Sequence, residues 1–161
     1  MLRELVALDC GFEIAAHRIE RRSFLRPFVL EKQNVVTELA LDGTPATLSA
    51  AIVRGWQVEH ACGAPPLALR VELGGVSFAY SGDTQWTPAL TEAARGADLF
   101  AVEAYTFDRP IRYHLNYQTL RAHLPQIHAE RVVLTHMSAT MLSRLADAEL
   151  PAAYDGMVID L

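Results

Sequence analysis

Four side chains in this sequence have the types and local settings that suit a divalent cation. Each lies at the end of a strand-like segment or in a loop beside one: His60, Asp83, His114 and His136. Imidazole nitrogen and carboxylate oxygen are ligands that zinc and manganese bind. One such residue alone usually has a structural role, and the alternative for Asp83 is that it only caps its own turn. Four of them gathered at one edge of a sheet would favour metal chemistry.

The segment that must position Asp83 runs from Val76 to Thr84. Its first five residues are rich in β-branched and aromatic types, which predicts a strand over Val76–Tyr80. A helix is predicted from Pro88 to Gly96, with a capping hydroxyl before it and a glycine at its end. Ligands in open α/β sheets bind at the carboxyl ends of strands. We therefore expect Asp83 to be held in a fixed direction at such an end.

A hairpin is expected to bring His60 to the same edge as Asp83. The alternating segment Leu69–Leu73 is joined to Val76 by a Gly-Gly turn, and His60 lies in the loop before it. Antiparallel strands place the start of one beside the end of the other. The hairpin therefore predicts that His60 and Asp83 are neighbours.

The rest of the second half alternates between strand and helix patterns. Glu103 and His136 each close a strand, and His114 lies in a loop before a helix. The predicted elements are strands over Leu99–Glu103, Arg131–Thr135 and Met157–Asp160 and helices over Tyr117–Leu124 and Thr140–Leu145. This alternation predicts an α/β fold with a mixed sheet, flanking helices and some parallel pairing.

The first third of the chain gives weaker signals. A helix is expected over Leu2–Leu8, and Phe12–Lys32 is ambiguous between helix and irregular structure. Four arginines, Arg18, Arg21, Arg22 and Arg26, have a spacing that favours a solvated helix face. A hairpin is predicted from Leu39–Leu41 and Thr47–Val53 around an Asp42-Gly43 turn, followed by a short strand at Trp56–Glu59.

Composition limits the class of protein. The 161 residues, 51% hydrophobic and 20% charged, suit one globular domain with a sizeable core. No apolar run reaches the roughly 18–20 residues that span a bilayer, so no membrane association is expected. A net charge of −5 argues against a dedicated nucleic-acid binder. Two cysteines, Cys10 and Cys62, are too few for a disulfide framework, which favours the cytoplasm.

Several ordered motifs resemble the C-terminal half of the metallo-β-lactamase superfamily, and within it the ribonuclease Z-like metal-dependent hydrolases. They are Ser81-Gly-Asp-Thr84 after an apolar strand, Leu134-Thr-His-Met-Ser138, His60 ahead of Pro65-Pro66, Ala97–Ala104, and the His114-Leu-Asn-Tyr-Gln-Thr helix start. The resemblance covers about residues 56 to 161 and implies a four-layer αββα sandwich.

The resemblance also implies roles for these residues. Asp83 would bridge two metal ions, zinc or manganese, with His60 and His136 as terminal ligands. His114 would donate a proton to the leaving group. Glu103 would orient a histidine from outside the ligand set, although a strand-end glutamate facing solvent is an equal alternative.

One departure from the family pattern affects the expected metal site. The family's remaining ligands lie in a His-x-His-x-Asp-His signature, and this sequence contains no His-x-His. We therefore expect residues 1–161 to form a single partial domain, an incomplete sandwich that lacks that N-terminal part. The intact family site holds two ions, and this chain would hold one or none.

The implied function is a metal-dependent hydrolase, most concretely a phosphodiesterase that attacks with a hydroxide generated by metal. Its substrate would be a small phosphodiester or an RNA end. Two alternatives stay open: a truncated, non-catalytic interaction module with an incomplete metal site, and the same fold acting on a thioester or lactam. An apolar sheet face left without its other half would favour self-association or a homo-oligomer.

Overall fold

The computed structural model describes residues 28–32 and 35–161, with side chains described from Leu39 onward. The helix predicted over Leu2–Leu8, most of the ambiguous Phe12–Lys32 segment and the four-arginine cluster lie outside the described residues. The end of the ambiguous segment is strand β1 (Phe28–Lys32), which pairs with β2 (Val35–Leu39) in a separate two-stranded antiparallel sheet.

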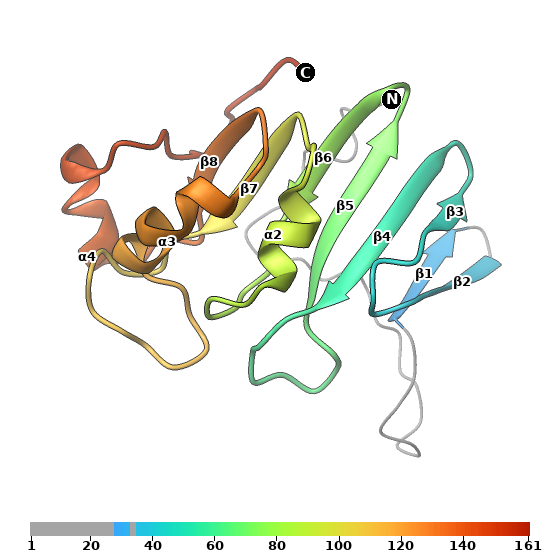
Figure 1. Cartoon of the computed structure of the whole chain (residues 1–161), viewed down its shortest axis with the longest axis horizontal. Coiled ribbons are helices and arrows are strands. Elements are labelled where there is room, and N and C mark those ends of the chain that lie inside the picture. The colour runs from blue at the N-terminus through green and yellow to red at the C-terminus, as the bar shows by residue number, and fades with distance from the viewer. Residues whose placement is uncertain (1–27, 33–34) are drawn as a thin grey trace.

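A six-stranded mixed sheet forms the centre of the molecule, and it confirms the α/β prediction (Figure 1). Its strands follow chain order: β3 (Ala46–Leu48), β4 (Ala51–Gln57), β5 (Leu67–Leu73), β6 (Val76–Tyr80), β7 (Leu99–Glu103) and β8 (Arg131–Thr135). Pairing is antiparallel from β3 to β6 and parallel from β6 to β8. The strands predicted from local patterns over β6, β7 and β8 have the predicted bounds.

Helices lie in the connections that parallel pairing requires. Helix α2 (Ala89–Ala94) joins β6 to β7, and α3 (Tyr117–His123) with the 3-10 turn η1 (Leu124–Gln126) joins β7 to β8. Helix α4 (Ala139–Leu142) and the 3-10 turn η2 (Leu145–Asp147) follow β8 and replace the single helix predicted there. The Asn116 side chain caps α3 by accepting from the Thr119 amide.

The hairpin predicted around Asp42-Gly43 is wrong in its turn position. Strands β3 and β4 reverse at Ser49-Ala50 instead, and the Gly43 amide donates to the Gly55 carbonyl at 2.9 Å. Gly43 has φ +86°, and a Cβ there would lie 2.4 Å from the Trp56 indole nitrogen. The glycine is therefore needed for a close approach to β4 rather than for a hairpin turn. The separate strand predicted at Trp56–Glu59 is wrong, because Trp56 and Gln57 are the end of β4 and the two residues after them are not in a strand.

The final strand predicted over Met157–Asp160 is also wrong, because those residues are irregular. An earlier segment takes the free edge of β8. The Leu134 amide donates to the Pro151 carbonyl and the Ala153 amide to the Leu134 carbonyl, each at 2.8 Å. That edge is thus already paired where a further strand would have had to join it.

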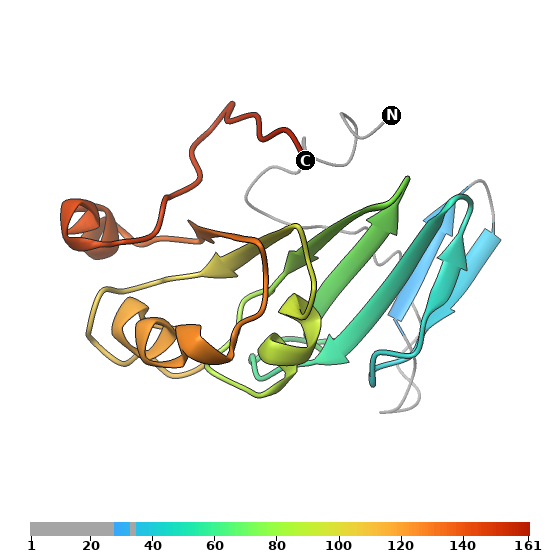
Figure 2. The ribbon, with the colours of Figure 1, turned by 45° about the horizontal axis from the view of Figure 1, so that its top comes forward.

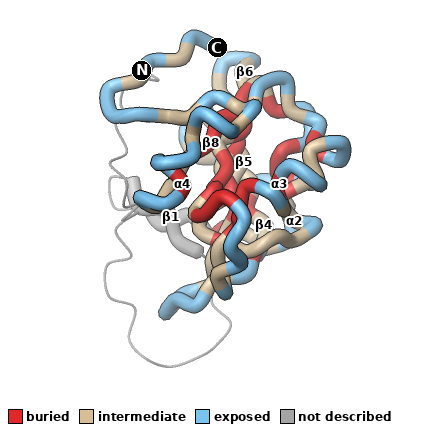
Figure 3. The backbone as a smooth tube through the Cα atoms, turned by 90° about the vertical axis from the view of Figure 1, so that its left-hand side faces the viewer, coloured by how far each residue is buried: buried red, intermediate tan, exposed pale blue. Residues whose placement is uncertain are grey.

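Helices α2 and α3 lie on one face of the sheet (Figure 2). Side chains on this face, such as Ala79 and Phe100, are fully buried with Leu90 and Ala93 of α2. On the opposite face Val71 and Phe78 are only half-buried, and Figure 3 shows the buried residues concentrated in the middle of the fold. In the described part of the chain, no helix is long and apolar enough to cross a membrane.

Candidate metal centre

Three neighbouring parallel strands end at one edge of the sheet and deliver polar side chains there. Glu103 is the last residue of β7, His136 directly follows β8, and Asp83 follows β6 by three residues. Parallel strands in register align their carboxyl ends, as the pairs Tyr80↔Ala101 and Glu103↔Thr135 show. The shared edge follows from the βαβ topology.

The turn that presents Asp83 depends on Gly82. This glycine has φ +63°, and a Cβ on it would lie 2.5 Å from the Leu67 carbonyl oxygen of β5. On the other side of Asp83, the Thr84 amide donates to Glu103 Oε2 at 2.8 Å. The turn is therefore fixed to both neighbouring strands, and the Asp83 side chain, 34% exposed, is left at the open edge.

Glu103 is a fully buried carboxylate rather than a solvent-facing one. Its Oε2 accepts the amides of Thr84 and Leu115, the latter at 3.2 Å, and its Oε1 contacts Nδ1 of His114. Burial raises the pKa of Glu103 above its ordinary range, against the opposing effect of these hydrogen bonds. Both carboxylate oxygens are thus used to hold the His114 loop against the strand ends.

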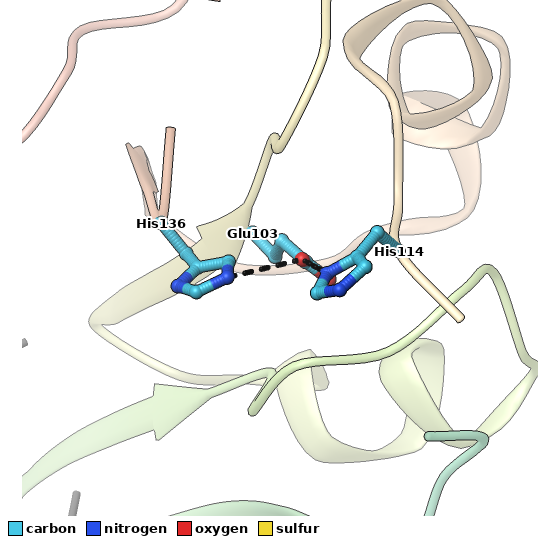
Figure 4. Close-up of side chains that lie close together, drawn as sticks. All are labelled: Glu103, His114 and His136. Carbon is cyan, nitrogen blue, oxygen red and sulfur yellow. Dashed lines mark hydrogen bonds and ion pairs between the residues drawn. The ribbon is translucent and has the colours of Figure 1, made fainter. Parts of the chain in front are cut away.

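His136 adopts a left-handed backbone conformation with φ +49°. For a residue with a Cβ this conformation costs about 1–2 kcal/mol, and such positions cluster at functional sites. Its Nε2 lies 3.5 Å from Asp83 Oδ2 and 3.8 Å from Glu103 Oε1. Figure 4 shows His136 and His114 on either side of the Glu103 carboxylate.

His60 reaches the same edge from the loop between β4 and β5. Its Nδ1 is 3.1 Å from the Tyr113 carbonyl oxygen, which can only accept, so Nδ1 carries the hydrogen and Nε2 keeps its lone pair. The His60 ring lies edge-on to the His114 ring, with 5.0 Å between centroids. The hairpin topology therefore brings His60 to the His114 side of the centre.

Tyr105 also belongs to the centre and was missed by sequence reasoning. Its ring stacks on His114 at 4.4 Å and near His136 at 5.4 Å between centroids. Its amide donates to the Leu115 carbonyl, and its carbonyl accepts from the Ser138 amide. An aromatic residue two positions after a strand-end glutamate was the available signal.

Among the described residues, one group of ligand atoms is compact enough to hold a single ion. The nitrogen and oxygen atoms of Glu103, His114 and His136 lie within 4.8 Å of one another. Asp83 Oδ2 lies beside this group, 3.5 Å from His136 Nε2. His60 is in no compact group of ligand atoms among the described residues, and the Glu103 oxygens already accept hydrogen bonds. Imidazole nitrogen and carboxylate oxygen are donors that suit zinc or manganese, so the side chains gathered here fit a divalent cation.

Comparison with known proteins agrees with the family that the sequence motifs resemble. A family model described as "Beta-lactamase superfamily domain" matches residues 5–137. An uncharacterized protein of Mycobacterium leprae is 32% identical over 121 residues, which are 73% of this chain and 42% of that protein. The chain thus spans less than half the length of this curated relative.

Solved structures with metallo-β-lactamase folds superpose on most of the chain. The metallo-β-lactamase fold protein YhfI from Bacillus subtilis has a TM-score of 0.62 at 17% sequence identity, and the match covers 76% of this chain and 54% of the YhfI chain. The short form of human tRNase Z has a TM-score of 0.58 at 21% sequence identity, and the match covers 77% of this chain and 49% of the tRNase Z chain. At these identities the likeness concerns the fold.

Proposed function

The chain belongs to the metallo-β-lactamase superfamily, and we propose that it acts as a metal-dependent hydrolase of phosphodiesters. The observation that carries the proposal is the pairing of the buried Glu103 carboxylate with His114 directly beside the Asp83–His136 pair. One pair suits proton transfer and the other suits metal binding, and both lie at the same open edge of the sheet.

In this proposal Asp83, His136 and His60 hold the metal, zinc or manganese. A divalent cation bound there would supply Lewis acidity and lower the pKa of a coordinated water towards neutrality. Catalytic zinc commonly takes three protein ligands and one open position. Asp83 and His136, whose ligand atoms lie 3.5 Å apart, would serve one ion of the family site with further ligands, and His60 would serve the other.

His114 is the proposed proton donor. Its Nδ1 faces Glu103 Oε1, so that nitrogen is engaged and the opposite ring nitrogen, Nε2, is the one that can meet a substrate. A carboxylate on Nδ1 fixes the ring orientation and stabilises the imidazolium. As water adds to phosphorus and the P–O bond breaks, His114 would give its proton to the departing alkoxide.

The proposed substrate class is a small phosphodiester or the end of an RNA. The net charge of −5 disfavours binding along an extended duplex. The fold is similar to that of human tRNase Z, short form, which makes an RNA end a specific candidate to test.

The test is hydrolysis of bis(p-nitrophenyl) phosphate by metal-free protein to which zinc or manganese is returned. We expect turnover that depends on added metal and a higher melting temperature with metal. Asp83→Asn should lose both, whereas Asp147→Asn, which changes an exposed carboxylate paired with Arg144, should keep both. A folded protein with neither response would favour the non-catalytic interaction module, and turnover of only a thioester or lactam would favour the other chemistry.

A further inference from the structure

The loop that carries His114 also carries two arginines, Arg109 and Arg112, that have no acidic partner within residues 39–161. Eight arginines lie in residues 39–161. In this part of the chain six of them contact a carboxylate or a backbone carbonyl: Arg54, Arg70, Arg95, Arg121, Arg131 and Arg144. The guanidinium groups of Arg109 and Arg112 have no such contact within these residues, and both are exposed. In the described part of the chain, the arginines without such a contact therefore lie in the loop that carries His114.

Arg112 lies at the tip of a tight turn that ends at His114. The His114 amide donates to the Ile111 carbonyl at 3.1 Å, and Tyr113 has φ +69°. The guanidinium carbon of Arg112 is 4.5 Å from the centroid of the Tyr113 ring, whose backbone carbonyl accepts from His60. Arg112 is thus held on the aromatic face of the residue that lies before His114 and accepts from His60.

The turn is docked rather than free. The Tyr113 amide donates to the Gln85 side-chain oxygen at 3.4 Å, and Gln85 in turn donates to the Glu59 carboxylate. Glu59 is an acidic side chain of the adjoining loop, and this hydrogen bond directs it to Gln85. Within residues 39–161 the exposed Arg112 guanidinium group therefore has no ion pair, while the backbone of the next residue is fixed to the segment after Asp83.

A guanidinium group on an aromatic face is well suited to bind phosphate, because its planar fork can donate two parallel hydrogen bonds. In the proposed reaction the scissile phosphate is bound by the metal and His114. From this geometry we infer that Arg112, with Arg109 of the same loop, binds a second phosphate of the substrate. The substrate class is then a phosphodiester with a further phosphate group next to the scissile one, an inference that rests on the proposed function.

The dinucleotide ApA and its 5′-phosphorylated form, pApA, test this inference because they differ only in the second phosphate. We expect metal-free protein in chelator to bind pApA about tenfold more tightly than ApA, as one charge-assisted interaction would give. Because this titration involves no hydrolysis, it reports on the second-phosphate site even if no turnover occurs. Turnover of both dinucleotides with metal present is scored separately and tests the proposed function.

Arg112→Gln should bring the pApA:ApA affinity ratio close to one, and Arg109→Gln should lower it partly. Arg121→Gln is the matched control, since it removes an exposed arginine on α3 that pairs with Glu149, and it should keep the ratio. The preference should also shrink as salt is raised. Equal binding of the two dinucleotides by the wild-type protein, or a preference that persists in Arg112→Gln, would overturn the inference.

Discussion

His136 Nε2 and Asp83 Oδ2 lie 3.5 Å apart, although their strands, β8 and β6, are separated in the sheet by β7. The separation is longer than that of a normal hydrogen bond. Neither atom is therefore committed to the other, and a cation can bind both. Glu103, at the end of the intervening β7, lies 3.8 Å from the same His136 nitrogen. A buried carboxylate therefore lies next to the Asp83–His136 pair.

Removing the charge of Asp83 should weaken metal binding. We expect Asp83→Asn to lower zinc affinity by about tenfold or more, because an amide oxygen replaces a carboxylate in the ligand set. Calorimetric titration of metal-free protein measures this directly. Asp147→Asn should match the wild-type protein, and equal zinc affinity in Asp83→Asn would show that this carboxylate is not a ligand.

Replacing His114 should slow hydrolysis in a way that depends on the leaving group. We expect His114→Gln to lose about 100-fold in kcat on an alkyl phosphodiester, whose alkoxide needs a proton. The loss should be smaller on a p-nitrophenyl ester, because that phenolate leaves without protonation. His123→Gln changes a histidine of α3 that stacks on Trp86 at 3.9 Å and should affect both substrates little. Equal losses on the two substrates would contradict proton donation by His114.

Burial of Glu103 should make the stability of the metal-free protein depend on pH. Because burial raises the pKa of Glu103 above its ordinary value of 4.5, the folded state binds this proton more tightly than the unfolded chain. The ionised carboxylate therefore costs stability as pH rises through the folded pKa. The glutamine in Glu103→Gln cannot ionise. The melting temperature of this variant should therefore rise relative to that of the wild-type protein as pH is raised from 4.5.

Thermal melts in chelator over a pH series measure this difference. Glu92→Gln is the control, because its carboxylate is 52% exposed on α2, and its difference from wild type should stay nearly flat. A Glu103→Gln difference that is likewise independent of pH would argue that hydrogen bonds fully offset the burial.

Gly82→Ala should destabilise the protein by about 2 kcal/mol, from a left-handed alanine and a steric clash. The clash arises because its Cβ would lie 2.5 Å from the Leu67 carbonyl. Chemical denaturation gives the free energy of unfolding, and Gly63→Ala, with no atom within 4 Å of its Cβ, is the control. Similar stabilities for the two variants would mean that the Asp83 turn does not depend on glycine.

The face of the sheet opposite α2 should promote self-association. Val71 and Phe78 are paired on this face and are half-buried, whereas Ala79 beneath α2 is fully buried. Partly exposed apolar faces tend to associate, so sedimentation velocity should show larger species as concentration rises. Val71→Asn, checked for folding by circular dichroism, should reduce this association. A monomer at every concentration would be the contrary result.

Local sequence patterns predicted strands β6, β7 and β8 because each is a short run of β-branched, aromatic or aliphatic residues bounded by turn residues. Once these strands were predicted with helices between them, parallel pairing placed Asp83, Glu103 and His136 at one edge. The Asp42-Gly43 turn was misplaced for the opposite reason. Glycine is required there because the Trp56 ring of the neighbouring strand leaves no room for a Cβ, and a contact of this kind cannot be predicted from a local sequence pattern.

The sequence by itself thus determined which residues end strands and which edge of the sheet they share, since both follow from periodicity and chain order. Only the tertiary structure decided the partners: that Glu103 is buried and faces His114, that Tyr105 stacks on the histidines, and that His60 meets Tyr113. These contacts depend on loop conformation and on side chains distant in sequence. Burial and hydrogen bonding across such distances are properties of the packed fold, so no single segment encodes them.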